Sequence, residues 1–163
     1  MRKPSTRALT MLATLPVFGI TVFGVRPMIA TPPASAAVVK AATSGACKGT
    51  AGVTVVVDFT KLGGKIVIAC DPGTPKTGLD ALKGAGFTFS FVPKIPGFVC
   101  RIDKLPNPCN GAPAKAFWAY SHAKAHGTWV LSNKGAGSYH PAPGTVQGWA
   151  FGASRKPGIA PPN

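Results

Sequence analysis

The stretch Val53–Phe59, VTVVVDF, decides the fold of this chain. Its β-branched side chains favour an extended strand. The glycines of Leu62–Gly64 predict a turn, and Lys65–Cys70, KIVIAC, is expected to return as the second strand of a hairpin. The sequence DPG at Asp71–Gly73 then breaks the pattern, so the hairpin is expected to end there.

One helix and five further strands are predicted after the hairpin. Thr77 is suited to cap a short helix, and Gly84 and Gly86 are suited to end it. The later strands are expected at residues 87–91, 98–102, 117–122, 128–132 and 145–151. This order predicts an α+β domain in which a twisted, mostly antiparallel sheet packs on one short helix.

Residues 1–36 have the features of a secretory signal peptide. Arg2, Lys3 and Arg7 give a positive start, Ala8–Gly24 is apolar, and Ala34–Ala36 offers a processing site of small residues. A retained membrane anchor is the alternative, but the apolar stretch is short for a span and contains a proline. We therefore expect a secreted or extracytoplasmic protein with three parts: a flexible leader at 37–52, a domain at 53–152 and a Pro-rich tail at 153–163.

The chain is strongly basic. It carries 18 Lys and Arg against 4 acidic residues, and loss of the four basic residues before position 37 lowers its net charge from +14 to +10. Scattered positive charge favours solubility and attraction to polyanions. Outside a cell these polyanions are wall polymers and lipid headgroups, so nucleic acid is not an expected partner. A solvated surface without a partner is the simpler interpretation of the same charges.

The four cysteines, Cys47, Cys70, Cys100 and Cys109, all follow the signal peptide. An even number of cysteines in an exported chain predicts two disulfides. Three pairings are possible, and we favour Cys47–Cys70 with Cys100–Cys109 because each bond then closes within one half of the domain. A zinc site is disfavoured because no C-x-x-C spacing is present.

No catalytic or metal-binding constellation is recognisable in the sequence. His122 and His126 are four residues apart and His140 follows later, but no acid stands near any of them. A G-x-S-x-G stretch is absent, and the four aspartates are scattered. We therefore expect a monomer that is not an enzyme and has no resident cofactor or metal.

The aromatic residues are concentrated late in the chain. All three Trp and both Tyr lie between positions 118 and 149, beside the glycine-rich stretch Gly135–Gly137. Two interpretations stay open. The rings form part of the core, or they form a platform for a flat organic ligand, because Trp and Tyr combine an apolar body with a polar group.

Several of these stretches resemble the C-terminal domain of transcobalamin and intrinsic factor. They are TGLDALKGAGF at Thr77–Phe87, FVCRI at Phe98–Ile102, the Phe117-Trp118 pair, GAGSY at Gly135–Tyr139, Gly144 and Trp149. The resemblance covers about residues 53–151. It implies a β-grasp-like sheet around one helix, which agrees with the order of elements predicted above.

The resemblance also implies a ligand face. In the cobalamin carriers the Trp strand and the following loop face the corrinoid, which corresponds here to Trp118, Gly135, Ala136, Gly137 and Tyr139. We add Trp129 on chemical grounds. The chain departs from the carriers at Ser138, where they tend to have Asp, and it lacks their large helical domain.

Two functions are therefore expected from the sequence. The first is an exported, non-enzymatic module that binds a small organic ligand, such as a corrinoid or another transported nutrient, for a membrane transporter. The alternative is a basic protein of the cell envelope that binds wall polymers or a protein partner and has no small ligand.

Overall fold

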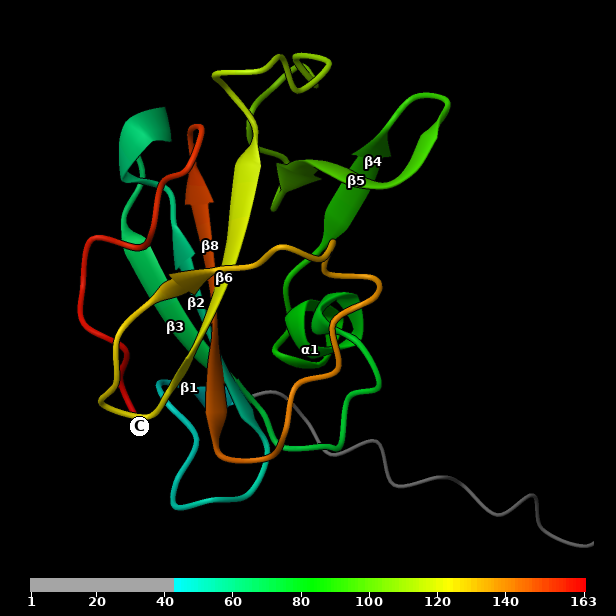
Figure 1. The fold of residues 1–163 in the computed structure, drawn as a ribbon. Coiled ribbons are helices and arrows are strands. Elements are labelled where there is room, and N and C mark those ends of the chain that lie inside the picture. Colours follow the sequence, from blue (N-terminus) through cyan, green and yellow to red (C-terminus); the bar gives the residue numbers. More distant parts are fainter. Residues whose placement is uncertain (1–42) are drawn as a thin grey trace, which may run out of the picture. The chain divides into compact units, whose positions relative to one another are not determined.

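The computed structural model describes residues 43–163, and Figure 1 shows their fold. The predicted signal peptide and the first part of the predicted leader lie outside the described residues. Within residues 43–163, no helix is both long enough and apolar enough to cross a membrane.

The main sheet has six strands in the order β1-β3-β2-β8-β6-β7. All neighbouring strands are antiparallel except the central pair of β2 and β8, which is parallel. The strands are β1 (Thr43–Ser44), β2 (Val53–Asp58), β3 (Ile66–Asp71), β6 (Trp118–Lys124), β7 (Val130–Leu131) and β8 (Thr145–Phe151).

Within residues 43–163, the remaining elements are one helical turn, one helix and a second sheet. They are the 3-10 helix η1 (Thr60–Leu62), the helix α1 (Gly78–Gly84) and the strands β4 (Phe89–Val92) and β5 (Ile95–Ile102), which pair only with each other (Figure 1). The predicted α+β class is confirmed, and the described part of the chain contains one short α-helix, as predicted. A parallel pair at the centre of the sheet was not predicted.

The limits of several predicted strands were wrong, and two strands differ most. The strand expected at 98–102 begins at Ile95 and passes through Pro96 and Gly97. Proline is tolerated in β5 because this strand has a neighbour on one edge only. On the open edge there is no second strand to which a backbone N–H would have to donate a hydrogen bond. The strand expected at 128–132 is reduced to Val130–Leu131 at the edge of the main sheet.

The helix α1 covers one face of the sheet. Thr77 caps it as predicted, because the Thr77 Oγ1 atom accepts a hydrogen bond from the Asp80 N–H at 3.1 Å. Ala81 and Leu82 are fully buried. At the first turn, a Cβ on Gly78 would lie 2.7 Å from the ring of Tyr120, so glycine allows the helix to approach the sheet closely.

The C-terminal residues 153–163 cover part of the opposite face of the sheet. They were expected to be a tail, but Pro157 and Pro161 are buried and the Trp129 Nε1–H donates to the Ile159 carbonyl at 2.6 Å. The apolar side chains of Val56 and Val146 on this face require a cover. Proline suits such a cover, since its nitrogen has no hydrogen to leave without a partner.

Both predicted disulfides are confirmed. The Cα atoms are 4.8 Å apart in Cys47–Cys70 and 5.7 Å apart in Cys100–Cys109. Cys47 is buried and the short strand β1 pairs with β3, so residues 43–47 of the predicted flexible leader are attached to the sheet. Disulfides indicate an extracytoplasmic environment.

Asp58 is a buried carboxylate at the end of β2. It accepts hydrogen bonds from the N–H groups of Thr60 and Gly158, both at 2.9 Å, and lies 3.6 Å from the guanidinium of Arg155. Burial by itself raises the pKa of this carboxyl group, but the hydrogen bonds and the arginine together bring the pKa below its ordinary value. The charged form of Asp58 therefore stabilises the folded protein and attaches the C-terminal residues to the sheet.

We expect Asp58→Asn to lower the free energy of unfolding by about 2 kcal/mol at pH 7, the scale of a hydrogen bond to a charged group. Because the pKa of Asp58 is lowered by folding, its contribution is present above the ordinary aspartate pKa and is lost as pH falls through the folded value. Urea denaturation of both proteins from pH 7 down to about pH 2.5 should show the difference closing below about pH 4. A difference that stays constant over this range would contradict the argument.

A second prediction concerns Gly148 on β8. A Cβ at this position would lie 2.7 Å from the Trp129 ring and 2.9 Å from Pro157. We expect Gly148→Ala to destabilise the domain by about 1–3 kcal/mol, as overpacking does. Gly135→Ala is the matched control, because its Cβ would meet nothing within 4 Å. Equal urea midpoints for the two variants would refute this account of how residues 153–163 pack.

Candidate functional site

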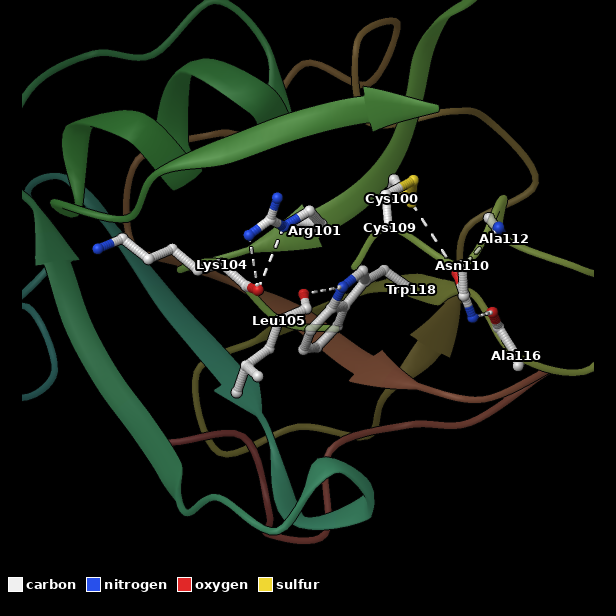
Figure 2. The surroundings of a disulfide bond; sticks show 9 residues. All are labelled: Cys100, Arg101, Lys104, Leu105, Cys109, Asn110, Ala112, Ala116 and Trp118. Carbon is white, nitrogen blue, oxygen red and sulfur yellow. Dashed lines mark hydrogen bonds between the residues drawn. A yellow bond between two sulfur atoms is a disulfide. The ribbon is translucent and has the colours of Figure 1, made fainter. Parts of the chain in front are cut away.

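The structure places Trp118 in the core. Its side chain is 5% exposed and its ring packs edge-on against Phe59 and Phe151, at centroid distances of 5.4 and 5.5 Å. Figure 2 shows the Trp118 Nε1–H donating to the carbonyl of Leu105, inside the loop closed by Cys100–Cys109. The polar group of this ring is therefore engaged within the protein, and its role in the structure is to hold the disulfide loop against the sheet.

Trp129 lies on the opposite face of the sheet. It is 6% exposed and packs with Val56, Ala123 and Val146, under the C-terminal residues. Trp118 belongs to the other cluster, together with the helix α1. The two tryptophans of the expected ligand face are therefore separated by the sheet and do not share a surface.

The loop Gly135–Tyr139 packs on the first turn of α1. The Gly78 N–H donates to the Tyr139 carbonyl at 3.0 Å, and Ala136 is buried. The half-buried Tyr139 ring stacks on His122, with centroids 4.4 Å apart and planes 23° apart. Burial raises the pKa of Tyr139 and lowers the pKa of His122.

Of the six expected site residues, the structure brings four together in this loop and leaves three of them accessible. Gly135 and Gly137 are exposed and Tyr139 is half-buried. The loop supports the helix, since a Cβ on Gly137 would lie 3.3 Å from Leu79. The two tryptophans do not join this group.

We expect Trp118→Ala to destabilise the domain by about 3–5 kcal/mol, the usual scale for a buried aromatic side chain. A domain of this size is stable by about 5–15 kcal/mol in total, so the effect should be plain in a thermal melt. Trp118→Phe keeps a ring but removes the bond to Leu105, and should cost about 1 kcal/mol. An unchanged melting temperature for Trp118→Ala would contradict the placement of this ring in the core.

A surface hollow of about 750 Å³ lies beside the end of β8. Three positively charged side chains line it, together with a half-buried aromatic ring and two small residues: Lys61, Lys115, Arg155, Phe151, Gly152 and Ala153. We call this set the cationic hollow. Phe151 ends β8, Lys61 lies in η1 and Lys115 lies in the loop before β6, so three segments far apart in the sequence meet here.

The cationic hollow has little negative charge to balance it. The only ion pair among the described residues joins Arg155 to the buried Asp58, which leaves Lys61 and Lys115 without an acidic partner. The Nε–H of Arg155 is buried and meets no acceptor within residues 43–163. The arrangement is suited to attract a negatively charged group.

Sequence reasoning missed the cationic hollow. Lys61 and Lys115 are 54 positions apart, and each stands alone in its segment, without a basic neighbour. The only available signal was Arg155 in the predicted tail, one of just two arginines after position 26.

The three histidines lie in separate environments. His122 stacks on Tyr139, the His126 N–H donates to the Pro161 carbonyl, and the ring of His140 contacts the Lys76 carbonyl. Across residues 43–163, no three side chains of His, Cys, Asp or Glu gather in a way that would hold a metal ion.

Comparison with known proteins places this chain in no family. No family model, no curated protein and no solved structure matches it.

Proposed function

We propose that this protein is an exported, non-enzymatic module that binds a small organic ligand in the cationic hollow. The observation that carries the proposal is the meeting of Lys61, Lys115 and Arg155 around the ring of Phe151. Arg155 is paired with Asp58, but Lys61 and Lys115 have no acidic partner among the described residues, so a negative group that enters the hollow would gain attraction from both lysines. A carboxylate, sulfonate or phosphate meets that requirement.

The size and the lining of the hollow support a small ligand with an apolar body. Ligand sites in proteins usually measure about 300–1,000 Å³ and combine apolar walls with a few polar groups. The cationic hollow is about 750 Å³, and Phe151 and Ala153 supply apolar surface beside the charges. A flat organic anion fits both properties, since its ring contacts Phe151 while its charge lies near the lysines.

The strand order supports a β-grasp-like architecture for this module. The hairpin of β2 and β3 comes first, α1 follows, and the last strand β8 inserts between β2 and β6. The helix then packs on one face of a mixed sheet. This arrangement agrees with the resemblance to the transcobalamin domain, so a corrinoid is one ligand to test, and delivery to a membrane transporter is the proposed role.

Titration with 2-naphthalenesulfonate tests the proposal, because this probe combines a flat ring with one negative charge. We expect the chain from Ala37 to bind it, and the double variant Lys61→Gln/Lys115→Gln to bind about tenfold more weakly or worse. The uncharged naphthalene-2-sulfonamide should bind poorly to both proteins. Cobalamin is titrated in the same way. Added salt should weaken the binding of the anion, because it screens the lysines.

Lys134→Gln is the matched control, since Lys134 is exposed and does not line the hollow. An equal loss of affinity in this control would favour the alternative function, a basic envelope protein that attracts polyanions over its whole surface. Equal binding of the charged and uncharged probes would reject the cationic hollow as the ligand site.

A further inference from the structure

The hairpin of β4 and β5 has an unusual surface. Five large hydrophobic side chains are exposed within residues 43–163, and three of them lie on this hairpin: Phe91 at 38%, Ile95 at 52% and Phe98 at 40%. Among the described residues the two strands pair with no other strand, and Figure 1 shows the hairpin extending away from the main sheet and α1. Exposed apolar side chains on a projecting element indicate a surface that contacts another body.

The base of the hairpin is held firmly. Ile102 is fully buried in the core, and Cys100 is joined to Cys109. The Asp103 carboxylate, just after β5, accepts a hydrogen bond at 2.8 Å from the N–H of Thr88, just before β4. Figure 2 shows the Arg101 guanidinium fixed on the Lys104 carbonyl beside the disulfide. The exposed side chains are thus presented by a rigid base, although an isolated two-stranded hairpin is only marginally stable in water.

The tip of the hairpin carries a positive charge among these apolar side chains. Val92 pairs with Ile95, so the turn consists of Pro93 and Lys94. Lys94 has a φ of 66°, a left-handed conformation that favours glycine. Lys94 therefore places a long, flexible cationic side chain at a position whose backbone conformation favours glycine.

The charges near the hairpin tip indicate what kind of surface the tip would contact. No acidic residue occurs between Asp80 and Asp103, a segment that contains the entire tip. Two of the four acids of the chain, Asp58 and Asp71, are buried, so the accessible charge of the described residues is almost wholly positive. The complementary surface is therefore one that is both apolar and negatively charged.

We propose that the tip of the β4–β5 hairpin inserts into the interface of an anionic lipid membrane. Phe91, Ile95 and Phe98 would enter the boundary between headgroups and acyl chains, and the Lys94 ammonium would extend to the lipid phosphates. Basic residues near an anionic leaflet contribute about 1 kcal/mol each, and apolar insertion adds to this. The proposal uses none of the side chains that line the cationic hollow, so it stands or fails apart from the proposed ligand.

Co-sedimentation with vesicles tests the proposal, with the chain from Ala37 at low ionic strength. We expect binding to vesicles that contain phosphatidylglycerol, little binding to pure phosphatidylcholine, and a loss of binding as salt is raised. The double variant Ile95→Ser/Phe98→Ser should bind about tenfold more weakly or worse, and Lys94→Gln a few fold more weakly. Val130→Ser is the matched control, because Val130 on β7 is 52% exposed, as Ile95 is. It should bind as the unchanged protein does.

Thermal melts establish that each variant is folded, and Ile95→Ser alone replaces the double variant if the latter is not. Binding that is the same for the hairpin variants and for Val130→Ser would overturn the proposal. So would an unchanged protein that does not sediment with phosphatidylglycerol. A dimer that separates in the hairpin variant, without any vesicle binding, would show that a second copy of the chain covers the tip instead.

Discussion

The central strand β2 is buried on both of its faces, and the rest of the domain is arranged around that constraint. All six residues from Val53 to Asp58 are buried. A strand so placed requires a neighbour along each edge and a cover on each face. β3 and β8 supply the edges, α1 covers one face, and residues 153–163 pack against the other.

This constraint links the stability of the fold to the proposed ligand site. Arg155 contacts the buried Asp58 at the end of β2 and also lines the cationic hollow. The same short segment donates the Gly158 N–H to Asp58. The position of the arginine is therefore set by the packing of the C-terminal residues on the sheet. Lys61 and Lys115 also line the hollow and have no acidic partner among the described residues, which leaves their charge available to a ligand.

The aromatic residues that cluster in the sequence are divided between the two faces of the sheet, because Trp118 and Tyr120 lie on β6 whereas Trp129 lies in the segment before β7. Trp118 and Tyr120 point to the side of α1, whereas Ala123 and Trp129 belong to the cluster beneath residues 153–163. Aromatic residues that are close in the sequence are thus distributed between two cores. Three of the five exposed large apolar side chains of the described residues lie instead on the β4–β5 hairpin.

Local patterns in the sequence determined most of the elements of this protein. The β-branched run at Val53–Phe59, the Thr77 cap and the even number of cysteines predicted the first strand, the helix and the two disulfides, because each depends on residues near one another or on simple pairing. Only the tertiary structure decided that β8 lies parallel to β2, that residues 153–163 cover the sheet, and that Lys61, Lys115 and Arg155 meet. These features join segments that are separated by 40 positions or more in the sequence. Their positions follow from the packing of whole elements, which leaves no periodic or local signal in the amino-acid sequence.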